Sequence, residues 1–505
     1  MTLVKTQPSY SNRGTQGFLR KPKLELSSMD SLSPQRPRSE SEAESDDKDR
    51  ISCLPEQVID RILSRLTSRE AQATCVLSRR WRHLYTSLLT DLDFDWLHLL
   101  EKQELNPEWV EKKRARYVEW VDNVVHRQTG GEHSLRRFAL RFDLNISYES
   151  RIDRWIRFAL AKQVKVLELY FMPACYGDFK PDCDPSCLPY LLGREILIDA
   201  DVGCSRRASG LGNFGSSPSI SWHVGCRYLE QLSLFRVNVE GELIEQLLAT
   251  CPVLEKLVLE KARALKSLRV SGQSLKLKYL RIRCCEDLQL VEIYDTNLVS
   301  FTYKGIEDEI RWCLDEVPRL SEVSIEGFFA ERVVLIMSLL SSLSCLRILK
   351  LSFSMPSPER LWIHLRRVPK LTNVKQLELR FEVFGDSSLL PLTPVIEAFP
   401  CLRSFVVELM YPMDMLCRQR ELKRVVGPPH RYLKVVEFHN YYGRSCDLEL
   451  VNYFIDNAIA LEKLVVNPCE EEYVTGGLKK VKEPRERAQQ QLKGNLPSRI
   501  ELVIN

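Results

Sequence analysis

The sequence predicts an α/β fold in which strand–helix units stack into a solenoid, with parallel strands on one side and helices on the outer side. A pattern of apolar-x-x-apolar-x-apolar recurs from Leu135 to Leu461, and amphipathic helical patterns lie between many of its copies. Before these repeats, three short helical patterns follow one another within residues 49–95. We therefore expect a small helical unit followed by a long repeat array.

Composition agrees with a large folded chain and excludes some classes of function. The chain has 505 residues, of which 44% are hydrophobic and 28% are charged. Its formal charge of +4 is small for this length, so composition gives no reason to expect a nucleic-acid or membrane surface. The longest uncharged apolar run, residues 333–346, is too short to span a bilayer.

No secretory signal pattern opens the sequence, which predicts an intracellular protein of the nucleus, the cytoplasm or both. The 16 cysteines are then expected to be reduced thiols. Residues 1–48 are rich in Ser, Pro, Lys and Glu and include an acidic serine cluster. Such a composition cannot offset the entropy lost on folding, so we expect a disordered tail.

The segment 49–95 begins with an apolar stripe at helical spacing. Pro55 suits the first helical turn, Thr67 and Glu70 have the spacing of a capping box, and Ser78 can cap a third helix. Three short helices bury too little surface for a self-sufficient core, so the unit is expected to need a partner. The stripe consists of Leu54, Val58, Ile59, Ile62, Leu63 and Leu66.

This segment resembles the F-box in its plant form, which begins DRIS-x-LP, continues through LS-x-RWR-x-L and ends in LDFD. The resemblance implies docking on a Skp-type adaptor and, through it, on a cullin. It also implies the residues that contact the adaptor or support the contact. These are Leu54, Pro55, Ile59, Ile62, Leu63, Leu66, Leu77, Trp81 and Leu84.

A helical bridge is expected over residues 96–134, because apolar residues recur at helical spacing between Glu108 and Gln128. Residues 135–429 are expected to form leucine-rich repeats, since most copies of the pattern are separated by roughly 20 to 30 residues. The copies begin at Leu135, Val164, Leu229, Leu254, Leu265, Leu277, Leu298, Leu320, Leu346, Val374, Leu402, Leu433 and Leu461.

Two stretches depart from this period. Residues 173–228 contain Pro, Gly, Ser and several cysteines, and form either a long loop or a unit altered by a different splice or gene model. Between Leu254 and Leu298 the copies lie close together, so helices are expected to be missing there. Residues 430–505 resemble the FBD module that ends many plant F-box proteins with leucine-rich repeats.

The resemblance implies the substrate-recognition subunit of a Skp-cullin-F-box type E3 ubiquitin ligase, which binds a protein substrate and is not itself an enzyme. Parallel strands would present a row of outward side chains on a concave face, and the x positions of the repeats are the candidate substrate contacts. Their signs are mixed, so they predict no acidic or basic substrate class. They include Glu168, Ser233, Arg269, Arg281, Lys350, Glu378 and Glu437.

Other functions remain as alternatives. The protein can be a scaffold that binds the adaptor without ubiquitination, or a small-molecule receptor, which a buried basic pocket would favour. The basic segment from Arg79 to Arg82 imitates a helix-turn-helix recognition element, although Trp81 and Leu84 make it half apolar.

No catalytic or cofactor-binding residue is assigned. Gly210, Gly212 and Gly215 spell GxGxxG without a preceding strand or a following helix. A zinc site is the remaining alternative, but its cysteines lack two tight pairs, so we expect no metal. These cysteines are Cys175, Cys183, Cys187 and Cys204.

Overall fold

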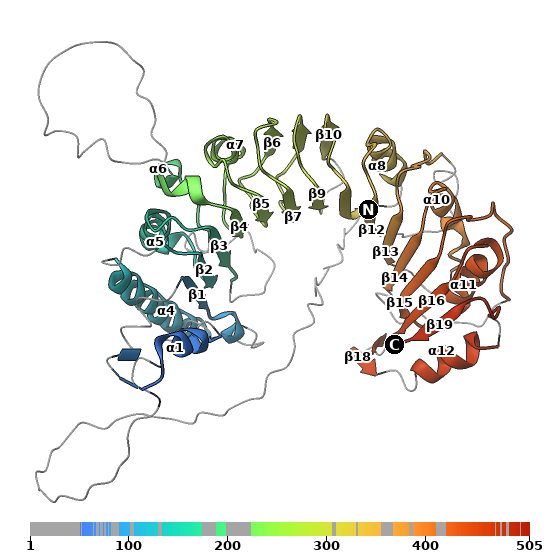
Figure 1. Ribbon diagram of the computed structural model, residues 1–505, viewed down its shortest axis with the longest axis horizontal. Coiled ribbons are helices and arrows are strands. Elements are labelled where there is room, and N and C mark those ends of the chain that lie inside the picture. The colour runs from blue at the N-terminus through green and yellow to red at the C-terminus, as the bar shows by residue number, and fades with distance from the viewer. Residues whose placement is uncertain are drawn as a thin grey trace, which may run out of the picture. The chain divides into compact units, whose positions relative to one another are not determined.

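The computed structural model is built around one long parallel sheet (Figure 1). It describes residues 51, 53–63, 65–66, 70, 74, 77–78, 80–81, 90–100, 106–129, 134–173, 188–197, 224–305, 310–329, 332–354, 367–382, 387–410, 421–469, 471–474, 477–480, 484–494 and 496–505. The expected disordered tail, residues 1–48, lies outside these residues.

Fourteen strands form the sheet, and each pairs in parallel with its neighbours. With few exceptions, neighbours in the sheet are also successive repeats of the sequence. In spatial order the strands are β1 (Asp91–Asp95), β2 (Arg137–Phe142), β3 (Val166–Phe171), β4 (Gln231–Phe235), β5 (Lys256–Glu260), β7 (Tyr279–Arg283), β9 (Ser300–Lys304), β11 (Glu322–Phe329), β12 (Ile348–Ser354), β13 (Gln376–Glu382), β14 (Ser404–Met410), β15 (Val435–Tyr441), β16 (Lys463–Pro468) and β19 (Glu501–Ile504).

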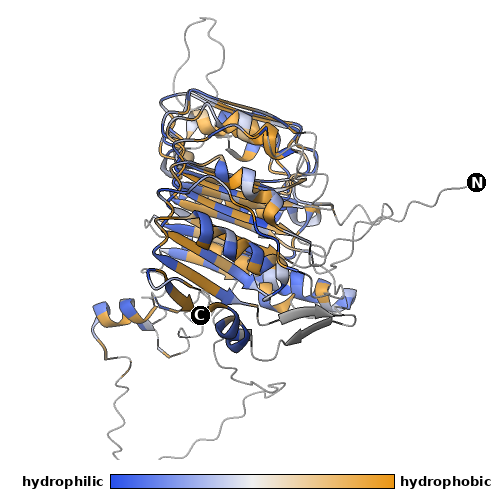
Figure 2. Cartoon of the chain, turned by 90° about the vertical axis from the view of Figure 1, so that its right-hand side faces the viewer, coloured by the Kyte–Doolittle hydropathy of each residue, from blue (hydrophilic) through white to orange (hydrophobic). Residues whose placement is uncertain are grey.

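The leucines of the repeat explain why these strands form. In the copy at Leu254, the three apolar positions Leu254, Leu257 and Leu259 are all buried, while the residues between them are partly exposed. Successive side chains of a strand point to opposite faces, so the pattern gives each strand one apolar and one polar face. Figure 2 shows this alternation of hydrophobic and hydrophilic residues along the strands.

Helices cover the apolar face of the sheet and complete the main core (Figure 1). The longest helix begins where the Asn106 side chain accepts a hydrogen bond from the Glu108 amide at 2.9 Å, with Pro107 in the first turn. Among the described residues these helices are α4 (Pro107–Gln128), α5 (Glu149–Ala161), α6 (Arg194–Leu197), α7 (Gly241–Thr250), α8 (Val333–Leu340), α10 (Thr393–Glu397), α11 (Ser445–Asn457) and α12 (Pro484–Leu492). Helix α1 (Glu56–Leu63) belongs to the small helical unit, which has its own core.

Between α7 and α8 the outer layer is a second sheet rather than helices. It consists of three parallel strands in the order β10 (Arg311–Asp315), β8 (Leu290–Tyr294) and β6 (Ser267–Ser271). Figure 1 shows β6 and β10 on the same side of the main sheet as α7 and α8. The expected loss of helices after Leu254 is therefore confirmed.

A tight approach joins α7 to this outer sheet. Gly241 is the first residue of α7, and a Cβ atom at this position would lie 2.0 Å from the carbonyl oxygen of Ser267 in β6. Only glycine fits without a backbone shift. The junction between the helical and the all-strand parts of the outer layer therefore depends on this residue.

Several strands end in the same left-handed turn. Arg236, Lys261, Cys284, Asp295 and Glu316 have φ angles between 48° and 56° and directly follow strand ends. The first four amides bond to the next strand along, as when the Lys261 amide donates to the Arg283 carbonyl at 2.9 Å, whereas the Glu316 amide donates to the Asp315 side chain at 3.0 Å. These turns satisfy backbone groups between repeats.

The sheet begins earlier than the repeat pattern indicated. Residues 91–95, which the resemblance assigned to the F-box, form strand β1 and pair with β2. The expected bridge helix, α4, packs in the same core through Tyr117 and Val121. The array therefore starts at Asp91 instead of Leu135, because the alternating DLDFD sequence supplies a strand with one apolar face.

The irregular segment 173–228 does not interrupt the sheet, since β3 and β4 on either side of it pair directly. Its described part includes Tyr190, which is buried and donates a hydrogen bond to Asp153 in α5 at 2.8 Å. At the C-terminal end, β15, α11, β16, α12 and β19 continue the array. An antiparallel pair, β17 (Glu471–Val474) and β18 (Gly477–Lys480), lies between β16 and α12 in the chain.

Candidate functional site

The polar face of the main sheet brings six of the seven candidate contact residues into one register row, which we call the middle row. Each member lies opposite the next through parallel strand pairing. From β1 to β16 the middle row runs Asp93, Ala139, Glu168, Ser233, Val258, Arg281, Thr302, Ser324, Lys350, Glu378, Val406, Glu437 and Val465.

The seventh candidate, Arg269, was wrongly assigned to this row. It lies in β6 of the outer sheet, where its guanidinium pairs with Glu292 of β8 at 2.9 Å. The reason is that Leu265 begins a copy of the repeat pattern whose strand replaces a helix. A strand of either layer has one buried face, so its local pattern is the same.

Two further rows flank the middle row, two residues before and two residues after it in each strand. Sequence reasoning missed them because it considered only the x position inside each LxxLxL copy. The row after the middle row contains more charged residues than either of the other two rows. It contains Asp95, Arg141, Tyr170, Phe235, Glu260, Arg283, Lys304, Glu326, Ser352, Arg380, Glu408, His439 and Asn467.

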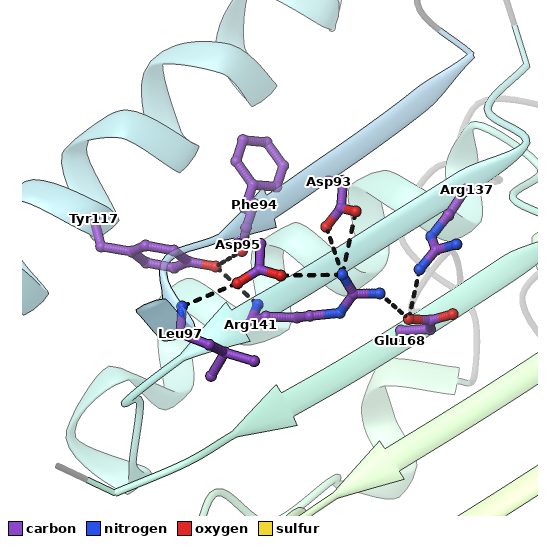
Figure 3. Close-up of polar contacts among 8 residues, drawn as sticks. All are labelled: Asp93, Phe94, Asp95, Leu97, Tyr117, Arg137, Arg141 and Glu168. Atoms are coloured by element: carbon purple, nitrogen blue, oxygen red, sulfur yellow. Dashed lines mark hydrogen bonds and ion pairs between the residues drawn. The ribbon is translucent and has the colours of Figure 1, made fainter. Parts of the chain in front are cut away.

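At the β1 end, Arg141 is the centre of a charged network (Figure 3). One terminal nitrogen, Nη2, donates to Glu168 of β3 at 2.6 Å, while Nη1 lies 3.2 Å from Asp93 and 3.3 Å from Asp95 of β1. Arg137 donates to the same Glu168 at 2.8 Å. These bonds tie three successive strands together and neutralise this end of the face.

Burial behind the network modifies its titration. Burial raises the pKa of Asp93, and Arg141 acts in the opposite direction. Tyr117 of α4 is fully buried, and its hydroxyl donates to the Phe94 carbonyl at 2.7 Å and accepts from the Arg141 amide at 3.1 Å (Figure 3). Burial also raises the pKa of Tyr117, so its hydroxyl stays protonated as a donor.

An aromatic pair follows on β3 and β4. The rings of Tyr170 and Phe235 stack with centroids 3.8 Å apart and an interplanar angle of 12°. The Lys261 ammonium lies 5.3 Å from the Phe235 centroid, within the range of a cation–π contact. On the polar face, the ion pairs of Arg141 are thus followed by an aromatic pair, Tyr170 and Phe235.

Next to this aromatic pair, the polar face of the sheet contains a hollow. A depression of about 670 Å³ lies over β4, β5, β7, β9, β11, β12 and β13. Its lining contains five basic and four acidic side chains together with several hydroxyls. It is therefore not the buried basic pocket that would favour a small acidic ligand.

Most ion pairs of Glu326 and Lys350 in the hollow are longer than those of Arg141 at the β1 end. Glu326 lies 3.8 Å from Arg283 and 3.9 Å from Lys304, and Lys350 lies 3.3 Å from Glu322 and 3.8 Å from Glu378. Most of these distances exceed a hydrogen bond. Glu326 and Lys350 are therefore less tightly engaged than Arg141.

The small helical unit has its own core, separate from that of the sheet. It consists of Ile59, Leu63 and Trp81, which are buried, with Leu54, Ile62 and Leu66 packed against them. Ser78 accepts a hydrogen bond from the Trp81 amide at 3.2 Å, as expected of a cap. Among the nine residues that the resemblance implied, these six form or flank a core.

Two of the remaining three, Pro55 and Leu77, are exposed, and Leu84 lies outside the described residues. Val58 is also exposed, with 41% of its surface accessible, and was not among the nine. The place of Val58 in the apolar stripe was the sequence feature that could have added it to the nine residues. Pro55, Val58 and Leu77 therefore lie outside the core of the helical unit.

Other chemistry finds no support in the part of the chain that the structure describes. No group of three potential ligands there can hold a metal ion, and no helix there is long and apolar enough to cross a membrane. Each cysteine in the described ranges is a free thiol. The four cysteines of the zinc alternative and the GxGxxG glycines lie outside those ranges.

Comparison with known proteins shows similarity to a leucine-rich-repeat domain family and to F-box proteins with such repeats. The family model of the At1g61320/AtMIF1 LRR domain matches residues 130–493. The F-box/LRR-repeat protein At2g42730 of Arabidopsis thaliana is 25% identical over 441 residues, which cover 82% of this chain and 90% of that protein. The F-box/FBD/LRR-repeat protein At1g13780 of the same plant is 23% identical over 455 residues, covering 84% and 92%.

Proposed function

The chain is a plant F-box/LRR-repeat protein that belongs to the At1g61320/AtMIF1 LRR-domain family, and from this premise we propose that it is the substrate receptor of a Skp-cullin-F-box ubiquitin ligase. Its helical unit binds a Skp-type adaptor, and its repeat array binds the protein to be modified. The receptor changes no bond itself, because ubiquitin transfer is carried out by the other subunits. It raises the concentration of the substrate near them.

One observation carries the proposal, namely the division of the helical unit into a small buried core and several exposed apolar residues. Ile59, Leu63 and Trp81 are needed to hold the unit together. Pro55, Val58 and Leu77 are exposed and are not part of that core. An adaptor that covers them gains roughly 1.5 to 3 kcal/mol for each large side chain before association costs.

A pull-down with purified Skp-type adaptor tests the proposal. Val58→Asp places a charge at an exposed position of the helical unit without entering its core, and we expect it to lower adaptor affinity by at least about tenfold. Leu335→Asp is the matched control, since Leu335 is an exposed apolar residue of α8 in the repeat array, 62% accessible. Equal capture of the wild type and Val58→Asp would contradict the proposal.

The alternative of a scaffold without ubiquitination is separated by a second assay. The ligase is reconstituted with cullin, RING subunit and charged ubiquitin-conjugating enzyme, and modification of a co-purified partner is measured. We expect modification that depends on Val58 and on the repeat array. Adaptor capture without any modification would instead support the scaffold.

A further inference from the structure

The hollow of the charged face arises from a change of side-chain size along the middle row. Long side chains, Arg281 on β7 and Lys350 on β12, flank two short ones, Thr302 on β9 and Ser324 on β11. All four line the depression. Neighbouring strands lie about 4.8 Å apart, so the two short residues open a gap roughly 14 Å wide between the flanking strands.

Hydroxyl groups form the floor of this gap. Ser300 and Thr302 of β9, Ser324 of β11 and Ser352 of β12 all line it. Within the described part of the chain, none of these four hydroxyls has a hydrogen-bond partner. They are therefore available to donate to a bound group.

Unengaged positive charge lies along the β5–β7 side of the hollow. Arg281 is exposed, and neither it nor Lys256 forms an ion pair or side-chain hydrogen bond with any residue of the described ranges. Arg283 lies in the next row, and its Nε is buried without a hydrogen-bond partner among those residues. Arg283 already pairs with Glu260 and Glu326 through its terminal nitrogens, so the two cations with free donor capacity are Lys256 and Arg281.

The carboxylates of the hollow do not cancel this charge, because each already faces a cation. Glu322 and Glu378 share Lys350, and Glu326 lies between Arg283 and Lys304. Glu255, at the edge, accepts from Lys278 at 2.6 Å, outside the lining. The surplus is therefore positive and is located at Arg281 and Lys256.

We infer that the hollow binds a carboxylate side chain from an acidic segment of the protein partner. Arg281 supplies the charge, Lys256 and Arg283 add to the field, and the Thr302 and Ser324 hydroxyls donate hydrogen bonds to the carboxylate oxygens. This inference deepens the proposed function and rests on it, since it names the chemistry of the substrate that the repeat array selects. The β1 end of the face takes no such group, because Arg137 and Arg141 are already paired with carboxylates of the chain.

A random dodecapeptide library displayed on phage and selected on the full chain tests the inference. We expect enrichment of Asp and Glu in the selected peptides relative to the input. The same selection on Arg281→Glu is expected to lose the acidic enrichment, because the charge of the side chain at position 281 is reversed. No enrichment, enrichment of neutral or basic residues, or acidic enrichment that persists in Arg281→Glu would overturn the inference.

A selected acidic peptide is then labelled and its affinity measured by fluorescence anisotropy. Arg281→Gln is expected to weaken binding about tenfold or more, the effect of one charge-assisted hydrogen bond. Arg319→Gln is the matched control, an exposed arginine outside the lining that makes no ion pair with a described residue. Equal affinities of the two variants would refute the assignment.

Ser324→Ala tests the hydroxyl floor in the same assay, with an expected loss of about tenfold for a removed hydrogen bond to a carboxylate. Val58→Asp separates this inference from the proposed function, because it impairs only adaptor capture and is expected to bind the peptide as the wild type does. A wild-type chain that captures the adaptor but binds no acidic peptide overturns only the carboxylate site. A wild-type chain that binds the acidic peptide but captures no adaptor overturns only the ligase proposal.

Discussion

His430 predicts a loss of stability in mildly acidic solution. Its side chain is buried, and its Nε2 lies 2.8 Å from the Tyr453 hydroxyl of α11. The His430 amide donates to the Asn457 carbonyl at 2.8 Å, and the Gly427 amide donates to the Asn457 side chain at 2.9 Å. The imidazole therefore sits where the segment before β15 is held against α11.

Burial lowers the pKa of His430 from 6.5 to about 4. In the unfolded chain the imidazole binds a proton as the pH falls through 6.5, whereas the folded protein resists protonation until about pH 4. The unfolded state thus binds more protons throughout this window, so the free energy of unfolding falls as the pH falls. Between pH 7 and pH 5 the expected loss is about 2 kcal/mol.

Urea unfolding followed by circular dichroism at pH 7 and pH 5 measures this loss. His430→Gln keeps a polar partner for Tyr453 but cannot titrate, so its stability is expected to fall less over the same interval. The comparison also removes the contribution of Glu397, whose pKa burial raises and which is common to both proteins. His98→Gln, at an exposed histidine, serves as the control. An equal pH dependence of wild type and His430→Gln would refute the argument.

Three further substitutions test the array by urea unfolding. Arg141→Met removes the cation shared by three carboxylates and is expected to destabilise the β1 end by about 2 kcal/mol, with carboxylate double variants recovering part of the loss. Gly241→Ala is expected to cost about 1 to 3 kcal/mol, because its Cβ would lie 2.0 Å from the Ser267 carbonyl oxygen. Glu316→Gly should stabilise by about 1 kcal/mol by relieving a φ of 48°, whereas Glu501→Gly, within β19, should destabilise.

The row of candidate contacts could be predicted because strand geometry is local. In each LxxLxL copy the residue between the last two apolar positions must point away from the core, and parallel pairing without slippage aligns these residues. Arg269 shows the limit of this reasoning. Its copy of the pattern has the same alternation of apolar and polar residues. Whether its strand joins the main sheet or the outer sheet depends on the length of chain between successive strands of the main sheet, which the local pattern does not encode.

The helical unit shows a different limit. Helical spacing correctly placed Leu54, Ile59, Ile62, Leu63 and Leu66 on or around one core. Spacing alone does not divide such a stripe into buried and exposed members, because that division depends on how Trp81 fills the space from a later helix. The exposure of Val58, four residues after Leu54, therefore emerged only from the structure.

The acidic residues of DLDFD connect these two parts of the molecule. Strand alternation puts Leu92 and Phe94 into the core, and sets Asp91, Asp93 and Asp95 on the charged face beside Arg136 and Arg141. The charges of this end are therefore satisfied within the chain, and a partner gains little by competing for them, since it would first have to break bonds as short as the 2.6 Å contact to Glu168. Cations that lack such bonds are found farther along the sheet, at Lys256 and Arg281. Selectivity for a charged partner is accordingly expected from the middle of the array and not from the end that adjoins the F-box.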